Sequence, residues 1–116
     1  MTAYRCELPW PPSVNRYLRR AGTRMHTTNE AKAYRASVGW LLAQAPRFGR
    51  HRVRILVDAF PPDNRRRDLD NIGKCLLDAV MHAGVFEDDS QVDELTLRRK
   101  PAVKGGTVIL HIERME

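Results

Sequence analysis

The sequence predicts a small α+β domain in which a mixed β-sheet of about four strands packs against two main helices. Stretches of alternating apolar and polar residues, typical of half-buried strands, occur near the start, in the middle and near the end of the chain, and two apolar stripes with helical spacing lie among them. Of the 116 residues, 42% are hydrophobic and 29% are charged, a composition typical of one globular core. We therefore expect residues 1–116 to form a single domain.

The first half of the chain contains one predicted strand and one predicted helix. Apolar and polar residues alternate over residues 4–8, and the proline-rich segment after them ends this strand. A basic loop is expected at residues 16–24. Thr27 and Glu30 have the spacing of a capping box, which predicts that a helix starts there and continues to Pro46. Its apolar stripe consists of Ala31, Tyr34, Val38, Leu41, Leu42 and Ala45.

The second half contains three predicted strands and the second helix. Residues 53–59 alternate cleanly, and residues 92–99 and 107–113 alternate on either side of a loop that ends in Gly105-Gly106. Between the first two of these strands lies an apolar helical stripe, with Gly84 at the position of a C-terminal cap. The stripe consists of Leu69, Ile72, Leu76, Ala79, Val80 and Ala83. These patterns leave the order of the strands open.

The charge of the chain is divided unevenly. The formal net charge is +6, but residues 1–67 carry 14 Lys and Arg against 4 Asp and Glu, whereas residues 68–116 carry 6 against 10. A basic surface binds polyanions by releasing their condensed counterions, so the first half suits a nucleic-acid partner, although many ordinary solvated surfaces are also basic.

Cysteine usage and hydropathy indicate the compartment. Cys6 and Cys75 are far apart and lack CxxC spacing, which argues against a zinc ribbon or a disulfide framework and favours two buried thiols in a reducing cytoplasm. The sequence has no apolar run near the 18 residues of a membrane span and no signal-peptide pattern. We expect a soluble cytoplasmic protein that has no membrane partner.

Acidic residues gather at the start of the second predicted helix and just beyond its end. Residues 65–71 read Arg-Arg-Arg-Asp-Leu-Asp-Asn, and Asp88-Asp89 follow the helix. Clustered carboxylates hold hard divalent cations, and adjacent arginines hold phosphate. A metal ion beside a phosphate is the arrangement that phosphodiester hydrolysis needs. The pattern predicts a metal-dependent nuclease, provided that the next strand runs back and brings these carboxylates together.

Each of these features also has an ordinary structural explanation. Asp70 and Lys74 are four residues apart, and an exposed ion pair between them would contribute only ~0.3–0.5 kcal/mol. Asp68 is placed to cap the helix, and residues 88–90 are typical of a polar turn. The helix start also attracts phosphate, which favours the functional interpretation when all the features are taken together.

Motifs along nearly the whole chain, from about Tyr4 to Glu113, resemble the RusA-type Holliday junction resolvases. The opening motifs are Leu8-Pro9-Trp10-Pro11-Pro12-Ser13, Asn15-Arg16-Tyr17 and Ala33-Tyr34-Arg35. The later ones are Arg65-Arg66-Arg67-Asp68-Leu69-Asp70-Asn71, Lys74, Asp78-Ala79, Ala83-Gly84, Asp88-Asp89-Ser90-Gln91-Val92 and Lys104-Gly105-Gly106. The spacing of DxDN, the lysine and DDxQV makes the resemblance specific.

The resemblance implies an endonuclease that cuts four-way DNA junctions as a homodimer with Mg²⁺ or Mn²⁺, in DNA recombination and repair in a bacterial or phage-infected cell. Asp68 and Asp70 match the family's first two catalytic, metal-binding aspartates, Asp89 matches the third, and Lys74 matches the essential lysine. Asp88 is expected to support its neighbour Asp89 from behind the metal site. Lys74 would either stabilise charge in the transition state or orient the attacking water.

The same reading gives the expected contacts to DNA. The residues expected to bind it are Arg65, Arg66, Arg67, Arg16 and Asn71, and Asn71 is also placed to orient an aspartate. Trp10 and Tyr17 suit stacking on exposed bases, with core packing as the alternative for Trp10. Two other functions remain open: a basic DNA-binding module without catalysis, and a metal-dependent nuclease that acts on other branched DNA or on RNA.

Overall fold

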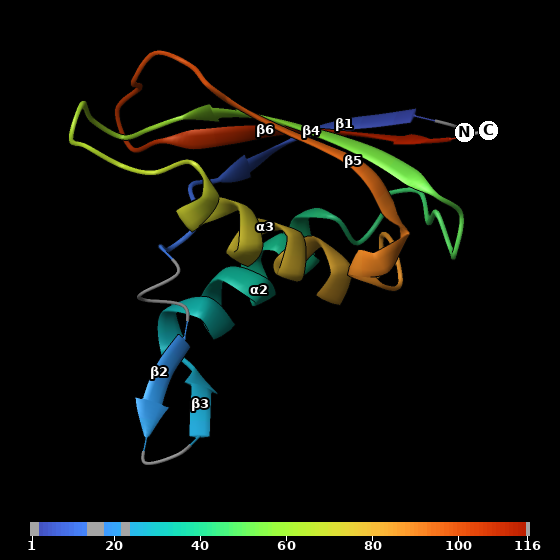
Figure 1. Ribbon diagram of the computed structural model, residues 1–116, viewed down its shortest axis with the longest axis horizontal. Coiled ribbons are helices and arrows are strands. Elements are labelled where there is room, and N and C mark those ends of the chain that lie inside the picture. The colour runs from blue at the N-terminus through green and yellow to red at the C-terminus, as the bar shows by residue number, and fades with distance from the viewer. Residues whose placement is uncertain (1–2, 14–17, 22–23, 116) are drawn as a thin grey trace.

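The computed structural model of the chain describes residues 3–13, 18–21 and 24–115, which form a four-stranded sheet, two helices and a separate hairpin (Figure 1). In chain order the elements are β1 (Ala3–Pro9), β2 (Leu18–Ala21), β3 (Arg24–Thr27), α2 (Asn29–Leu41), β4 (Val53–Phe60), α3 (Asp70–His82), the 3-10 turn η1 (Asp89–Gln91), β5 (Val92–Arg99) and β6 (Thr107–Arg114). The predicted α+β fold is confirmed.

The sheet has the order β1-β6-β4-β5, and only the pair β4–β5 is parallel. Parallel neighbours need a crossover connection, and α3 provides it between β4 and β5. Because of this crossover, β5 begins near the end of α3 and runs back toward its start. The end of β5 therefore lies beside the start of α3: a Cβ on Gly73, in the first turn of α3, would lie 3.1 Å from the Leu97 side chain near the end of β5.

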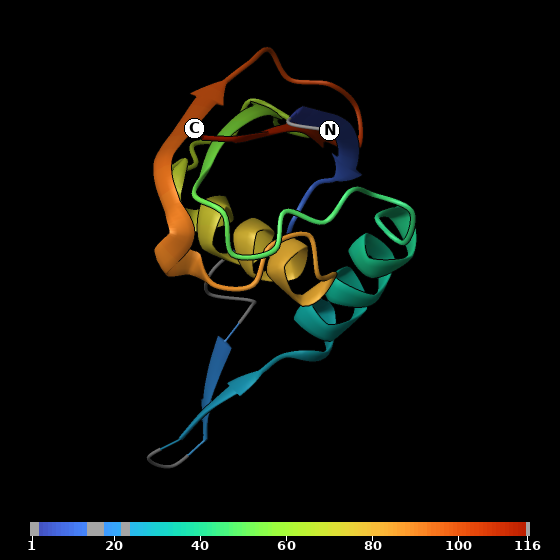
Figure 2. The same ribbon diagram turned by 90° about the vertical axis from the view of Figure 1, so that its right-hand side faces the viewer.

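The core lies between the sheet and its two helices, which cover the same face (Figures 1 and 2). The predicted apolar alternation is confirmed in β4 and β6, whose inward side chains are buried. The largest fully buried side chains are Phe86, Leu8, Leu42, Ile55, Leu76, Leu110, Ile112, Val38, Val53, Val57 and Val80. Gly84, with a φ of 88°, lies just beyond the end of α3, as its predicted role at the helix end requires.

Other sequence expectations meet mixed outcomes. Cys75 is buried and Cys6 half-buried, both as free thiols, as expected. No helix in the described part of the chain is long and apolar enough to cross a bilayer. The start of α2 differs by one residue: Thr28, not Thr27, is the N-cap, and its hydroxyl accepts from the amide of Ala31 at 3.2 Å.

The segment expected to be a basic loop was predicted wrongly. Its described parts are β2 and β3, which pair antiparallel and project from the body as a hairpin (Figures 1 and 2). The arginines in these strands interrupt the apolar alternation that identifies a strand in sequence, whereas backbone pairing needs no particular side chain. The expected contacts of Arg16 and Tyr17 lie outside the described residues.

An ion pair between a buried aspartate and a half-exposed arginine lies on the sheet face away from the helices. The carboxylate of Asp58 in β4 accepts from the Arg98 guanidinium in β5 at 2.7 and 3.1 Å, and His111 Nε2 lies 3.4 Å from it. The Asp58 side chain is only 11% exposed. Hydrogen bonding to Arg98 lowers the pKa of Asp58, against the opposing effect of burial. The interaction joins the parallel strands β4 and β5 at their outer face.

We expect Asp58→Asn to lower the free energy of unfolding by about 1–3 kcal/mol at neutral pH, because the paired charge is lost from a buried position. The folded pKa is depressed, so the stabilisation is present above the unfolded pKa, near 4, and disappears as the pH falls through the folded value. Urea unfolding at pH 7 and pH 3 should show that the two proteins converge in acid. Glu94→Gln, which changes an exposed carboxylate on β5, is the matched control, and an equal deficit for Asp58→Asn at both pH values would contradict this account.

Candidate active site

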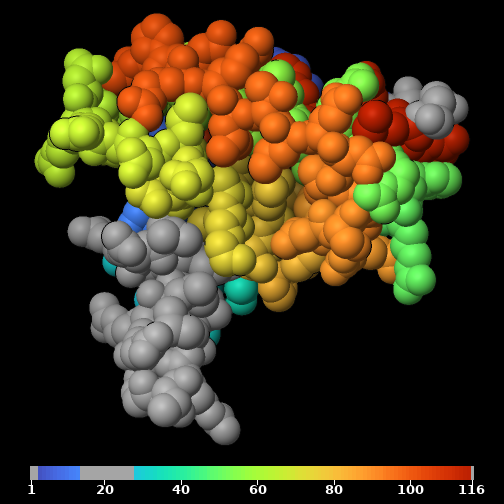
Figure 3. All heavy atoms as spheres, in the orientation of Figure 1, coloured from blue at the N-terminus to red at the C-terminus, as the bar shows by residue number. Residues whose placement is uncertain are grey.

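A groove of about 410 Å³ runs between α3 and the strand β5 that returns beside it. Three of the four predicted catalytic residues line it: Asp70, Lys74 and Asp89. Figure 3 looks onto the side of the molecule where these two elements meet. Gly73 and Leu97 face each other in the groove, and the absence of a side chain on Gly73 allows helix and strand to approach closely.

The acidic residues are spread along this groove. Asp70 begins α3, and Lys74 lies one turn further on. Asp89 lies at the other end of the helix: its charge raises the pKa of Asp78, which is two turns beyond Asp70. Within the described residues, no three His, Cys, Asp or Glu side chains lie close enough together to hold a metal ion. The reason is the crossover: β5 does run back along α3, as expected, but Asp89 stands before the strand, at the far end of the helix.

The predicted catalytic side chains are exposed and unpaired. Asp68, Asp70, Asp89 and Lys74 all lie at the surface, and none of these four side chains makes a hydrogen bond or ion pair with another described residue. Two of the three ordinary explanations therefore do not apply: Asp70 and Lys74 are not paired, and the N-cap of α3 is Leu69, which makes no side-chain capping bond. The third is confirmed, because residues 88–90 do belong to a polar turn. These carboxylates keep their oxygens available for a cation or for water.

The three consecutive arginines have different surroundings. Arg67 pairs with a residue of its own loop: its side chain is 26% exposed, and its guanidinium lies 2.7 Å from the carboxylate of Asp63. The same carboxylate accepts from the backbone amide of Arg65 at 3.0 Å. These hydrogen bonds lower the pKa of Asp63 to about 2, so the pair stays ionised at neutral pH. Arg65 and Arg66 remain exposed and so are available for phosphate contacts, although Arg65 lies 3.6 Å from the Asp63 carboxylate.

Asp68 lies apart from the groove. It lines a second pocket with Arg65 and Arg67, on the loop just before α3. Asn71 is half-buried in the first turn of the helix, where its backbone N–H donates to the backbone carbonyl of Asp68 at 3.2 Å. The structure therefore brings Asp70, Lys74 and Asp89 to one groove and places Asp68 at its neighbouring pocket.

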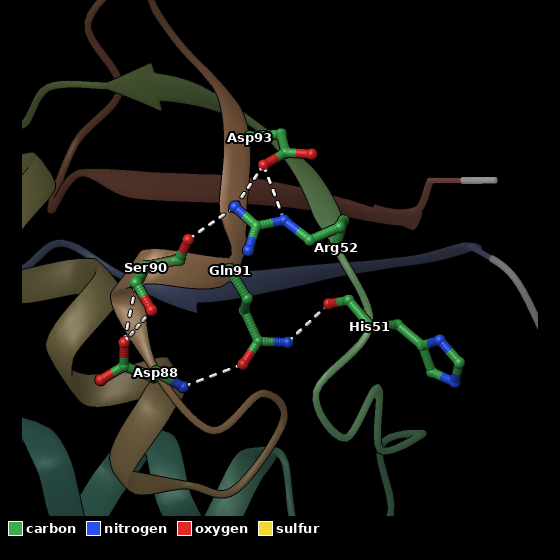
Figure 4. Close-up of polar contacts among 6 residues, drawn as sticks. All are labelled: His51, Arg52, Asp88, Ser90, Gln91 and Asp93. Atoms are coloured by element: carbon green, nitrogen blue, oxygen red, sulfur yellow. Dashed lines mark hydrogen bonds and ion pairs between the residues drawn. The ribbon is translucent and has the colours of Figure 1, made fainter.

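Asp88 acts as a cap of the turn that carries Asp89 (Figure 4). Its carboxylate accepts from the Ser90 amide at 2.9 Å and from the Ser90 hydroxyl, and these bonds lower its pKa. The Asp88 side chain is directed at Ser90 and so restrains the backbone of the turn that carries Asp89. Its expected place behind a metal site stays a prediction.

Gln91 fixes the same turn from inside the protein. Its side-chain oxygen accepts from the backbone amides of Glu87 and Asp88, both at 2.9 Å, and its side-chain amide donates to the carbonyls of Gly49 and His51 at 2.9 and 2.6 Å. Figure 4 shows the bonds to Asp88 and His51. The residue is 4% exposed, and all four hydrogen bonds that its amide group can make are formed. Sequence reasoning assigned Gln91 no role, although it stands in the motif that contains Asp89.

Comparison with known proteins identifies the family. The model of a protein family described as Endodeoxyribonuclease RusA matches residues 9–113. The chain belongs to the RusA family. Two relatives are a crossover junction endodeoxyribonuclease of Enterobacteria phage HK97, 42% identical over 100% of this chain and 98% of its own length, and that of Escherichia coli (strain K12), 41% identical over 99% and 98%.

A third RusA relative, the crossover junction endodeoxyribonuclease of Enterobacteria phage 82, is 40% identical over 99% of this chain and 98% of its own. The resemblance inferred from the motifs is confirmed. Among solved structures, the periplasmic domain of Helicobacter pylori MotB aligns with a TM-score of 0.43 and 14% identity, over 99% of this chain and 76% of that one. This likeness is too weak to support an argument.

One ion pair behind the groove of this RusA-family chain was not anticipated. Arg35 on α2 donates to the carboxylate of Asp78 on α3 at 2.9 Å, which ties the two helices together beside Asp89. Burial raises the pKa of Asp78, and the nearby Asp89 raises it further, while His82 lowers it. Both partners stand in motifs shared with the RusA family, but only contact between the two helices identifies them as a pair.

We expect Gln91→Leu to lower the free energy of unfolding by about 2–5 kcal/mol, because four backbone groups lose their hydrogen-bond partner at once. Gln91→Glu should cost as much at neutral pH, because it keeps the oxygen that accepts from Glu87 and Asp88 but places a buried carboxylate oxygen against the carbonyls of Gly49 and His51. Ser90→Ala is the matched control on the exposed side of the same turn, and it should change stability little. Urea unfolding measures all three, and a Leu variant as stable as Ser90→Ala would show that Gln91 does not hold this turn.

Proposed function

We propose that this protein is an endodeoxyribonuclease that resolves four-way (Holliday) DNA junctions by metal-dependent hydrolysis of phosphodiester bonds. Its family membership and its full-length relatives, which are named crossover junction endodeoxyribonucleases, support this proposal. The observation that carries it in the structure is the groove along α3, where two carboxylates and an ammonium lie at the surface with no partner in the part of the chain that the structure describes.

The carboxylates suit Mg²⁺ or Mn²⁺ in a particular way. Mg²⁺ is usually held by one or two carboxylates together with phosphate oxygens and water, so it does not require a preformed cage of three acidic groups. We propose that Asp68, Asp70 and Asp89 are the metal ligands, with substrate phosphate completing the site. When bound, such an ion lowers the pKa of water and neutralises charge on the phosphate.

The remaining residues of the site act on the phosphate backbone. Lys74 lies between Asp70 and Asp89 in the groove, where its ammonium either stabilises negative charge in the transition state or orients the attacking water. Arg65 and Arg66 are exposed and hold neighbouring phosphates. The start of α3 adds the positive end of the helix dipole close to these arginines.

We propose that the active form is a homodimer in the cytoplasm of a bacterial or phage-infected cell, acting in DNA recombination and repair. A junction is resolved by symmetric cuts in two opposing strands, and one chain provides one groove. A twofold dimer presents two grooves to one quasi-symmetric substrate.

A labelled four-way junction incubated with the protein should be cut at paired symmetric positions when Mg²⁺ or Mn²⁺ is present and left intact when it is absent. Plain duplex, flapped DNA and RNA are the competing substrates, and sedimentation of the free and bound protein measures its oligomeric state. Binding without cleavage in either metal would favour a non-catalytic DNA-binding module. Equal cleavage of flaps or RNA would favour a nuclease of another specificity, and a monomer in both states would refute the dimer.

Asp70→Asn and Lys74→Ala should each slow junction cleavage by about 10²-fold or more, the usual cost of losing a charged group that acts on the reacting phosphate. Both variants should keep their fold, because neither side chain has a structural partner among the described residues. Junction binding should persist for Asp70→Asn, with a log–log salt slope of about −0.9 per phosphate neutralised.

Glu94→Gln, which removes a carboxylate of β5 that is paired with Arg54 and does not line the groove, is the control and should cut normally. Cleavage by Asp70→Asn at the rate of the wild type would remove Asp70 from the metal site. Loss of binding together with cleavage in a folded variant would show that the metal is needed to hold the DNA.

A further inference from the structure

The second pocket, beside the start of α3, has features that the cleavage reaction does not explain. Its volume is about 130 Å³, and it lies between the loop at residues 61–69 and the turn at residues 99–102. Its buried lining residues, Ala59 and Ile72, form the inner part. Trp10 lines it from the segment that follows β1. The pocket therefore combines an aromatic wall and an apolar interior with a charged entrance.

We propose that this pocket receives a single unpaired base from the DNA substrate. The proposal rests on the proposed function, since branched DNA offers bases that are free of their partners where strands exchange. Unpaired bases bind proteins by stacking on aromatic faces and by hydrogen bonding along their edges. Trp10 supplies the aromatic surface, and the polar groups of Arg65 and Asp68 lie at the exposed side of the pocket.

The size of the pocket suits one ring system. A cavity of about 150 Å³ in another protein accommodates benzene, so a pocket of 130 Å³ that opens to solvent has room for one six-membered ring, such as that of a pyrimidine, and none for a stacked pair. The charged groups that line the pocket are Asp63, Asp68, Arg65, Arg67, Arg99 and Lys100. Arg67 is paired with Asp63, and the other cations suit the phosphates on either side of a base, whereas Trp10 and the apolar interior suit the base itself.

The walls of the pocket are held in place before any ligand binds. The Tyr34 hydroxyl donates to the carbonyl of Pro9, next to Trp10, at 2.7 Å. Gly106 packs so closely that a Cβ there would lie 3.0 Å from Trp10. On the other side, Arg99 donates to the carbonyl of Arg67 and so joins β5 to the loop. Such restraints reduce the ordering that binding has to impose.

The pocket adjoins the proposed cleavage site, so a base bound there would position the DNA for cleavage. Asp68 lines the pocket, and Asp70, two residues further on, lines the groove. A base held in the pocket therefore places the backbone of its own strand beside the proposed metal ligands. The pocket thus binds only where the DNA has an unpaired base, whereas Arg65 and Arg66 bind the phosphates of any duplex arm.

Two protein variants and one altered DNA test the proposal. Trp10→Leu removes the stacking surface, and Ala102→Phe fills the pocket while Trp10 stays in place. The altered DNA is a four-way junction with abasic nucleotides at the exchange point. Binding is measured without divalent cation, so that no strand is cut, and a plain duplex is the reference ligand. Trp40→Leu is the control, because Trp40 is 85% exposed on α2 and is not part of either pocket.

We expect each pocket variant to bind the junction about 5- to 150-fold more weakly, the range expected for one stacked base, and to bind the duplex as the wild type does. The abasic junction should lose the same factor with wild-type protein and lose nothing further with Trp10→Leu, because both changes remove one interaction. In the Trp40→Phe protein, where Trp10 is the only tryptophan, the junction should quench the fluorescence and the duplex should not.

An equal loss of junction and duplex binding would mean that the variants act only through folding, and additive losses from protein and DNA would mean that the base lies elsewhere. Either result contradicts the proposal that the pocket binds a base. If affinity falls with the variants but the abasic junction binds like the intact one, the pocket holds a phosphate. The proposed function is tested separately. If the wild-type protein cuts junctions, the proposed function holds even when base binding in the pocket is contradicted. If it neither prefers nor cuts junctions, both the proposed function and the base-binding pocket are refuted.

Discussion

The parallel pairing of β4 with β5 is the constraint on which the rest of this structure depends. Parallel strands require a crossover, and α3 fills that role, so the helix lies along β5 and a groove forms between them. The loop that enters α3 carries Asp68 and the arginines, and the turn that leaves it carries Asp89. Every residue proposed for catalysis therefore lies on this one connection.

Charged and polar side chains in this molecule divide into two groups. Those that make close partnerships build the frame: Gln91 holds the turn before β5, Arg67 and Asp63 hold the loop before α3, and Arg35 with Asp78 joins the helices. The proposed catalytic residues Asp68, Asp70, Lys74 and Asp89 are exposed, and their side chains have no partner among the described residues. This division has a physical basis, since a carboxylate already paired with a guanidinium has less capacity to bind a cation.

Much of the fold was predictable from local pattern. The strands near residues 4–8, 53–59, 92–99 and 107–113, and the helix ended by Gly84, follow from alternation, helical spacing and a glycine at positive φ, all of which are properties of neighbouring residues. The hairpin of β2 and β3 was missed because its arginines hide the alternation. Asp68 does not cap α3, the ordinary explanation that its position allowed, because the N-cap is the next residue, Leu69.

By itself, the sequence determined the composition of the candidate site and the family to which the chain belongs, because motif spacing is a property of the chain alone. Only the tertiary structure decided how these groups are arranged. Asp70, Lys74 and Asp89 line one groove while Asp68 faces a pocket with Trp10, and Arg67 is taken up by Asp63 while Arg65 stays exposed. These distinctions depend on the direction of a crossover and on contacts between residues far apart along the chain, which local periodicity does not encode.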